Sequence, residues 1–170
     1  MSNDPITDVQ LADLAEDLGM ALVERKLTVA AAESCTGGWI AKALTDRPGS
    51  SAWFSYGVVT YSNLAKQRVL GVTPATLERY GAVSQRCVQQ MVNGVVKLSG
   101  ARVAVAVSGI AGPDGGSDDK PVGTVWFGFR WPGERVAERL RFQGNREAVR
   151  RRATEHALLR LRKGIDHWLG

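Results

Sequence analysis

The sequence feature that most constrains the fold is an almost continuous apolar run near the middle of the chain. Residues 102–107 read RVAVAV, and glycines stand close by at positions 100 and 109. A short run of small and β-branched apolar residues between glycines is typical of a strand that is buried on both faces of a sheet. The run therefore predicts a central strand.

Helical and extended patterns alternate on either side of this strand. Asp4 before Pro5 is typical of a helix start, Ser84 can cap a helix, and Gly100 can end one. We expect helices over 5–25, 39–44, 62–70, 74–80, 85–99 and 146–169, and strands over 28–33, 53–61, 102–107, 122–131 and 135–142. The alternation predicts a layered α/β protein. The tight turn between the last two strands requires an antiparallel portion, so the sheet is predicted to be mixed.

The length and composition exclude several classes of protein. A chain of 170 residues fits one compact domain, here residues 1–170, and 44% hydrophobic with 23% charged residues excludes wholesale disorder. Two cysteines, Cys35 and Cys87, make neither a disulfide framework nor a zinc site. The polar N-terminus does not resemble a signal peptide, and no apolar run approaches the ~20 residues that cross a bilayer. We expect a soluble, cytoplasmic protein with no membrane partner.

The positive charge is concentrated at the C-terminal end. Residues 130–170 carry eleven basic and five acidic side chains, whereas residues 1–129 carry eleven and twelve. A basic tail is a common sign of a nucleic-acid partner. The tail has few aromatic residues between its charges, namely Trp131, Phe142 and Trp168, and it matches no known reader module. Both observations argue against nucleic-acid binding, so we expect no nucleic-acid partner and keep nucleic-acid binding only as a competing hypothesis.

The first candidate for chemistry is the segment ESCTGG, residues 33–38, at a predicted strand-to-helix turn. Ser34 and Cys35 are both possible nucleophiles. The free N–H groups at the start of a helix suit an oxyanion or a phosphate, and the glycines let a ligand approach the backbone. The simpler alternative is that Ser34 or Thr36 only caps the following helix.

The second candidate is the pair Tyr61 and Lys66, which the predicted elements bring to the carboxyl edge of the sheet. Open α/β sheets bind ligands at that edge. A lysine held in its neutral form can remove the proton of a serine hydroxyl and so activate it. The simpler alternative is a solvated lysine next to a tyrosine at the edge of the core.

The third candidate is the glycine-rich segment SGIAGPDGGS, residues 108–117. It matches neither the Walker A loop nor the dinucleotide-binding pattern, so it predicts no triphosphate or dinucleotide. Backbone N–H groups in such a loop can hold a polar ligand. A long mobile surface loop is the alternative.

Taken together, these segments resemble the CinA C-terminal domain family, the nicotinamide-nucleotide amidases. The resemblance covers about residues 6–165 and rests on ordered motifs: ESCTGG, then TYSN with Lys66, GAVS at 81–84, SGIAGPDGGS with KPVGTV, and F-x-G-N-R at 142–146. The chain departs from the family pattern at Leu64, where glutamate is common. Larger members carry an additional N-terminal domain, so this chain resembles the stand-alone form.

The resemblance implies a three-layer α/β/α sandwich, a homodimer, and hydrolysis of nicotinamide mononucleotide to nicotinic acid mononucleotide and ammonia in pyridine nucleotide salvage. It implies no metal and no organic cofactor. Ser34 would be the nucleophile, Lys66 the base, and Tyr61 a residue that relays or positions the proton. The implied substrate-binding residues are Cys35, Thr36, Gly37, Gly38, Ser108, Gly109, Ala111, Gly112 and Arg146.

Three questions stay open at this point. Cys35 is a rival to Ser34 as the nucleophile. Several bacteria carry more than one chain of this family, so an inactive nucleotide-binding paralogue is an alternative function. The basic tail, finally, can be explained by a ligand with one phosphate rather than by a nucleic acid if Arg146 at the start of the last helix binds the substrate. We expect Arg150–Arg152 to be solvated or to contact another subunit.

Overall fold

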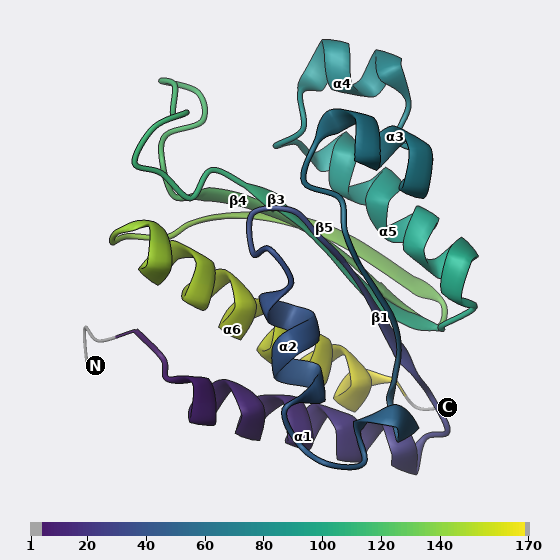
Figure 1. The fold of residues 1–170 in the computed structure, drawn as a ribbon. Helices are drawn as coiled ribbons and strands as arrows, with labels where there is room; N and C mark the ends of the chain where they lie inside the picture. The colour runs from purple at the N-terminus through teal and green to yellow at the C-terminus, as the bar shows by residue number, and fades with distance from the viewer. Residues whose placement is uncertain (1–4, 169–170) are drawn as a thin grey trace.

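The computed structural model describes residues 5–168, in which one five-stranded sheet lies between two layers of helices (Figure 1). The strand order is β2–β1–β3–β4–β5. The inner strand β1 pairs in parallel with β2 and β3, whereas β4 pairs antiparallel with β3 and β5. The strands are β1 (Val29–Glu33), β2 (Phe54–Val59), β3 (Val103–Gly109), β4 (Thr124–Trp131) and β5 (Glu134–Arg141). The predicted α/β class and mixed sheet are confirmed.

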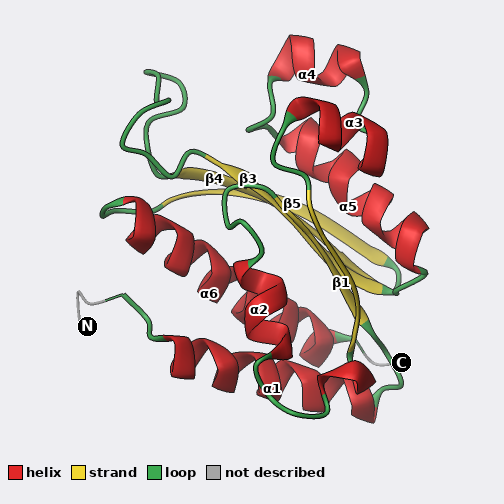
Figure 2. Cartoon of the chain, in the orientation of Figure 1, coloured by secondary structure: helices red, strands yellow, loops and turns green. Residues whose placement is uncertain are grey.

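Each face of the sheet is covered by helices (Figure 2). One layer contains α1 (Asp8–Glu24), α2 (Trp39–Thr45) and α6 (Arg146–His167), and the other contains α3 (Asn63–Leu70), α4 (Pro74–Tyr80) and α5 (Gln85–Ser99). A short 3₁₀ helix, Ser50–Ala52, precedes β2. None of the helices within residues 5–168 is long and apolar enough to cross a membrane. Because helices cover both faces of the sheet, the predicted three-layer arrangement is confirmed.

The central strand β3 divides the core because successive side chains point to opposite faces of a sheet. Val103, Val105 and Val107 pack with the layer of α1, α2 and α6. Ala104 and Ala106 pack with α5. All five are fully buried, which explains why the sequence of this strand is apolar throughout.

The helix ends are where the sequence prediction needs correction. Helix α1 begins at Asp8 rather than at Pro5, because Thr7 and Gln10 form a capping box in which each side chain accepts a backbone N–H bond from the other residue (3.2 and 2.9 Å). Asp4, the predicted cap, lies outside the described residues, as does Leu169, the predicted end of the last helix. Ser84 does cap α5, by accepting from Cys87 N at 3.2 Å.

The parallel pairing of β1 with two neighbours brings three chain segments together at one edge of the sheet. Glu33 is paired with Val59 of β2 on one side and with Val107 of β3 on the other. The residues that follow these partners therefore emerge side by side where the three strands end. This edge is where open α/β sheets place their ligand sites.

Gly94 in α5 sets the distance between that helix and α3. A Cβ atom at this position would lie 2.1 Å from the carbonyl oxygen of Leu70, at the end of α3. We expect Gly94→Ala to lower the free energy of unfolding by ~1–3 kcal/mol through overpacking, measured by urea denaturation. Asn93→Ala, at an exposed neighbouring position, is the control and should change stability by less than ~0.5 kcal/mol. Equal stability of the two variants would contradict this close helix contact.

Candidate active site

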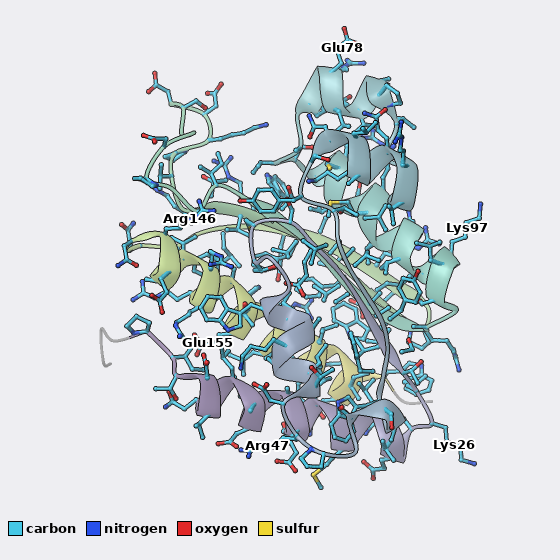
Figure 3. All side chains as sticks on the ribbon, viewed as in Figure 1. Lys26, Arg47, Glu78, Lys97, Arg146 and Glu155 are labelled. Carbon is cyan, nitrogen blue, oxygen red and sulfur yellow. The ribbon has the colours of Figure 1, made fainter. Side chains whose placement is uncertain are left out.

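A cavity of about 290 Å³ lies at the edge where the three strands end. Its walls come from the turn after β1, the start of α3, the glycine-rich loop after β3 and the start of α6. Figure 3 shows Arg146 at the first turn of α6, beside the base of that loop, while Lys97 and Glu78 point away from the molecule. The predicted site residues that line the cavity are Ser34, Cys35, Tyr61, Lys66, Ser108, Gly109, Ala111, Gly112 and Arg146.

Lys66 is the most unusual residue of the cavity because its long cationic side chain is only 1% exposed. Its Nζ atom donates hydrogen bonds to Ser34 Oγ (3.0 Å), Thr60 O (2.7 Å) and Tyr61 O (3.1 Å). The first turn of α3, capped by Ser62, places Lys66 over the end of β1. The alternative of a solvated lysine is therefore wrong: the fold directs this amine to Ser34.

The surroundings of Lys66 favour its neutral form. Burial lowers the pKa of Lys66 from its ordinary value of 10.5. A neutral amine has two N–H groups and one lone pair, and the carbonyl oxygens of Thr60 and Tyr61 can only accept hydrogen bonds. In the neutral amine these carbonyls hold the two N–H groups, and the bond to Ser34 reverses: the ammonium donates to Ser34 Oγ, whereas the neutral amine accepts from the Ser34 hydroxyl through its lone pair.

Cys35 lies next to this pair but in a different chemical state. Burial, with the nearby carboxylate of Glu33 as a smaller contribution, raises the pKa of the Cys35 thiol to about 12. The nucleophilic form of cysteine is the thiolate, which is scarce at neutral pH when the pKa is this high. The contact of Lys66 Nζ with Ser34 Oγ, together with the raised pKa of the thiol, therefore favours Ser34 over Cys35 as the candidate nucleophile.

Glu33 stabilises the turn after β1 by accepting hydrogen bonds from N–H groups of the turn and of the following helix. Its buried carboxylate accepts hydrogen bonds from Thr36 Oγ1 (2.5 Å) and from backbone N–H groups at the start of α2. Those donors are Gly38 N (3.1 Å), Ile40 N (3.1 Å) and Ala41 N (2.8 Å). Burial raises the pKa of Glu33, and these four donors act in the opposite direction by stabilising the carboxylate.

This arrangement corrects one part of the sequence-based prediction. The Gly38 N–H is bound to Glu33, and the Gly37 N–H donates to Ser34 O at 3.0 Å. Neither N–H group is therefore free to bind an oxyanion, contrary to the sequence-based prediction. Thr36, Gly37 and Gly38 line a separate cavity of about 340 Å³ with Arg150. The glycines thus shape the turn, and both adopt positive φ (61° and 98°), which is a backbone conformation that suits glycine.

Tyr61 and Arg146 meet across the mouth of the cavity. Arg146 donates to the hydroxyl of Tyr61 (3.0 Å) and to the carbonyl of Gly112 (2.8 Å). Tyr61 contacts Lys66 through its main-chain carbonyl. Within residues 5–168 no hydrogen bond joins the Tyr61 hydroxyl to Ser34 or Lys66, so a direct proton relay through that hydroxyl has no hydrogen-bonded path in this structure.

The glycine-rich loop is not a purely external loop, because its base forms one wall of the cavity. Gly109 is the last residue of β3, and a Cβ atom there would lie 2.7 Å from a methyl group of Val125. Ser108 beside it is 1% exposed.

Across residues 5–168 no group of three or more His, Cys, Asp or Glu side chains is arranged to hold a metal ion.

Sequence reasoning missed Thr60, Arg150 and the role of Glu33. Glu33 carried a signal, since a carboxylate ends an otherwise apolar strand. Thr60 acts through its carbonyl and Arg150 through a contact with Cys35 that spans 115 residues, so neither has a local signal. The basic tail also differs from expectation: Arg150 contacts the turn, and Arg151 donates to Asp8 (2.6 Å) of α1. Much of the tail thus pairs within the chain.

Comparison with known proteins shows the family of the chain. The model of the CinA C-terminal domain family matches residues 11–165, and the chain belongs to this family. It is 55% identical over 154 residues to a protein of Escherichia coli strain K12 named nicotinamide-nucleotide amidohydrolase PncC, covering 90% of this chain and 93% of that one. A Pseudomonas putida protein of the same name is 56% identical over 156 residues, covering 91% and 94%.

Solved structures show the same fold. The competence/damage inducible protein CihA of Agrobacterium tumefaciens superposes with a TM-score of 0.89 at 40% identity, covering 98% of this chain and 100% of that one.

Proposed function

We propose that the protein is a nicotinamide-nucleotide amidohydrolase of pyridine nucleotide salvage, which converts nicotinamide mononucleotide to nicotinic acid mononucleotide and ammonia. The observation that carries the proposal is the hydrogen bond between Lys66 Nζ and Ser34 Oγ inside the cavity. The names of relatives at 55–56% identity support the substrate. The inactive-paralogue alternative would predict nucleotide binding without turnover.

In the proposed mechanism Ser34 Oγ attacks the carboxamide carbon while its proton moves to neutral Lys66. The carbonyl oxygen becomes an oxyanion. The N–H of Cys35, the residue directly after the nucleophile, is the donor that this position supplies to an oxyanion. Collapse of the tetrahedral intermediate breaks the C–N bond, and Lys66 returns the proton to the departing nitrogen, which leaves as ammonia.

The second half of the reaction hydrolyses the acyl-enzyme. Lys66, neutral again, takes a proton from a water molecule as the water attacks the acyl carbon. The Ser34–acyl bond breaks, Ser34 regains its proton from Lys66, and the carboxylic acid product forms. The carbonyls of Thr60 and Tyr61 keep the amine in place through both halves.

Arg146 is proposed to bind the substrate phosphate, because its planar fork matches phosphate oxygens and it lies at the start of α6. The loop residues Ser108 to Gly112 would surround the nucleotide. Tyr61 would act as a positioning residue, with its hydroxyl on Arg146 and its carbonyl on Lys66.

The decisive experiment measures ammonia release from nicotinamide mononucleotide, nicotinamide riboside and free nicotinamide under the same conditions. The proposal expects the mononucleotide to have the highest kcat/KM, since only it carries the phosphate. Binding of the mononucleotide by calorimetry with no ammonia release would instead support the inactive paralogue.

Arg146→Ala is expected to raise KM for nicotinamide mononucleotide by ~10–100-fold, because a charge-assisted bidentate contact is lost. The kcat/KM for nicotinamide riboside should change far less. A steady-state comparison of the two substrates measures the difference. An equal loss for both substrates would contradict a phosphate role for Arg146.

The homodimer stays a prediction of the family resemblance, and the cytoplasmic location and the single-domain organisation stay predictions of the composition and the length. Light scattering coupled to size-exclusion chromatography tests the first of these.

A further inference from the structure

Arg150 touches the nucleophile turn without lining the cavity that contains Ser34. It lies four residues after Arg146, so both arginines belong to the same side of α6. Arg150 Nε donates to Cys35 O (3.0 Å) and its Nη2 donates to Thr36 O (3.2 Å). The guanidinium also lies over the ring of Trp39, 5.0 Å from the ring centre.

The two contacts fix the orientation of consecutive peptide groups just after Ser34. A peptide unit is planar, so holding the carbonyls of Cys35 and Thr36 sets the directions of the Thr36 and Gly37 N–H groups. The Gly37 N–H in turn donates to Ser34 O at 3.0 Å. That carbonyl shares its peptide plane with the Cys35 N–H, so the effect of Arg150 reaches the nucleophile through this bond. Glu33 binds N–H groups at the far end of the same turn, from Gly38 onward. The turn is thus held by a carboxylate that accepts from its N–H groups and a guanidinium that donates to its carbonyls.

The approach of Arg150 depends on the sequence of the turn. A Cβ atom on Gly37 would lie 3.0 Å from Arg150 Nη2, and Gly37 has a φ of +61°. A glycine therefore serves both the bend and the close contact. The fork of an arginine can reach two neighbouring carbonyls at once, which a lysine ammonium on a flexible stem does not reproduce.

We propose that Arg150 is a positioning residue for the nucleophile: its guanidinium holds the Cys35 and Thr36 carbonyls so that Ser34 Oγ and the Cys35 N–H keep their attack geometry. The inference rests on the proposed function for the reaction that Ser34 carries out. The contacts of Arg150 with the turn do not depend on that function. It assigns to an arginine of the basic tail a role that needs no contact with the substrate.

The test compares Arg150→Ala and Arg150→Lys with wild type, and uses Arg162→Ala as the matched control. Arg162 is on the same helix and pairs with Asp17 and Asp166, away from the turn. We expect both Arg150 variants to lower kcat by ~10–100-fold with KM changed by less than about threefold, because small misplacements of reacting groups cost this much. Arg162→Ala should keep wild-type kcat.

Two further readouts separate positioning from a general structural role. Guanidinium at a sub-denaturing concentration should partly restore kcat of Arg150→Ala and leave wild type and Arg162→Ala unchanged. A fluorophosphonate reagent, followed by mass spectrometry, should label Ser34 more slowly in Arg150→Ala than in wild type. If Arg150→Ala fails to fold, Arg150→Lys decides the question alone.

The outcomes are distinct from those that test the substrate. Slower Ser34 labelling in the Arg150 variants, with no amidase activity in wild type, would retain the positioning role and reject the substrate. Wild-type kcat and labelling rate in the folded Arg150 variants would overturn the inference.

Discussion

Ser34→Ala is expected to reduce ammonia release from nicotinamide mononucleotide by ~10⁴–10⁶-fold in kcat, the range found when one member of a cooperating catalytic unit is removed. The reason is structural: Ser34 Oγ is the hydroxyl that Lys66 Nζ contacts in the cavity. Although Ser34 is only 8% exposed, the substitution removes a single oxygen atom, so we expect the fold to stay intact. Calorimetry should still detect the bound mononucleotide.

Cys35→Ala is the matched control for this experiment, since it removes the rival nucleophile from the adjacent position. The Cys35 thiol is buried and its pKa is raised to about 12, so we expect the variant to keep activity within about tenfold of wild type, a loss consistent with small packing changes near a site. If Cys35→Ala were inactive and Ser34→Ala active, the nucleophile would be reassigned to Cys35.

Lys66→Met is expected to lower kcat by ~10²–10⁴-fold, the usual contribution of a general base. Methionine keeps the length of the side chain but has no proton-accepting nitrogen. Its thermal midpoint must be measured beside the activity, because removing a buried amine and leaving the Thr60 and Tyr61 carbonyls unpaired have opposite effects on stability. Lys97→Met, at an exposed position of α5, is the control and should behave as wild type.

The same lysine predicts a pH dependence of activity. Burial lowers the pKa of Lys66 below 10.5, and the neutral amine is the active base. The kcat/KM should therefore rise with pH until Lys66 is largely deprotonated, at a pH below 10.5. Activity that falls over this range would contradict a neutral lysine base.

The pKa of Lys66 also predicts a pH dependence of stability. Between the lowered pKa of the folded state and 10.5, the unfolded chain binds a proton that the folded chain does not. The contribution of Lys66 to the free energy of unfolding should therefore rise with pH across this window, whereas the buried thiols of Cys35 and Cys87, whose pKa values are raised, act in the opposite direction above their ordinary pKa of 9.0. Denaturation at several pH values isolates the lysine: the free energy of unfolding of wild type minus that of Lys66→Met should increase with pH.

Much of the fold could be read from local patterns. The apolar strand at 102–107, the turn residues between β4 and β5, and the cap at Ser84 each carry their own signal, because propensity, burial period and capping depend on near neighbours in the chain. The sequence pattern places the start of α1 too early, at Pro5. The chain instead uses Thr7 as the cap, because the capping box of Thr7 and Gln10 satisfies two backbone N–H groups.

The sequence by itself determined which residue types could do the chemistry, through Ser34, Lys66 and the glycine-rich loop. Only the tertiary structure decided how they act. The parallel pairing of β1 with β2 and β3 brings Ser34 within 3.0 Å of a lysine 32 residues away, and buries that lysine enough to lower its pKa. The fold also places Arg150, 115 residues from Cys35 in the sequence, on the turn after β1. Hydrogen bonds and desolvation at such sites depend on groups that are distant in sequence, and these have no local pattern to reveal them.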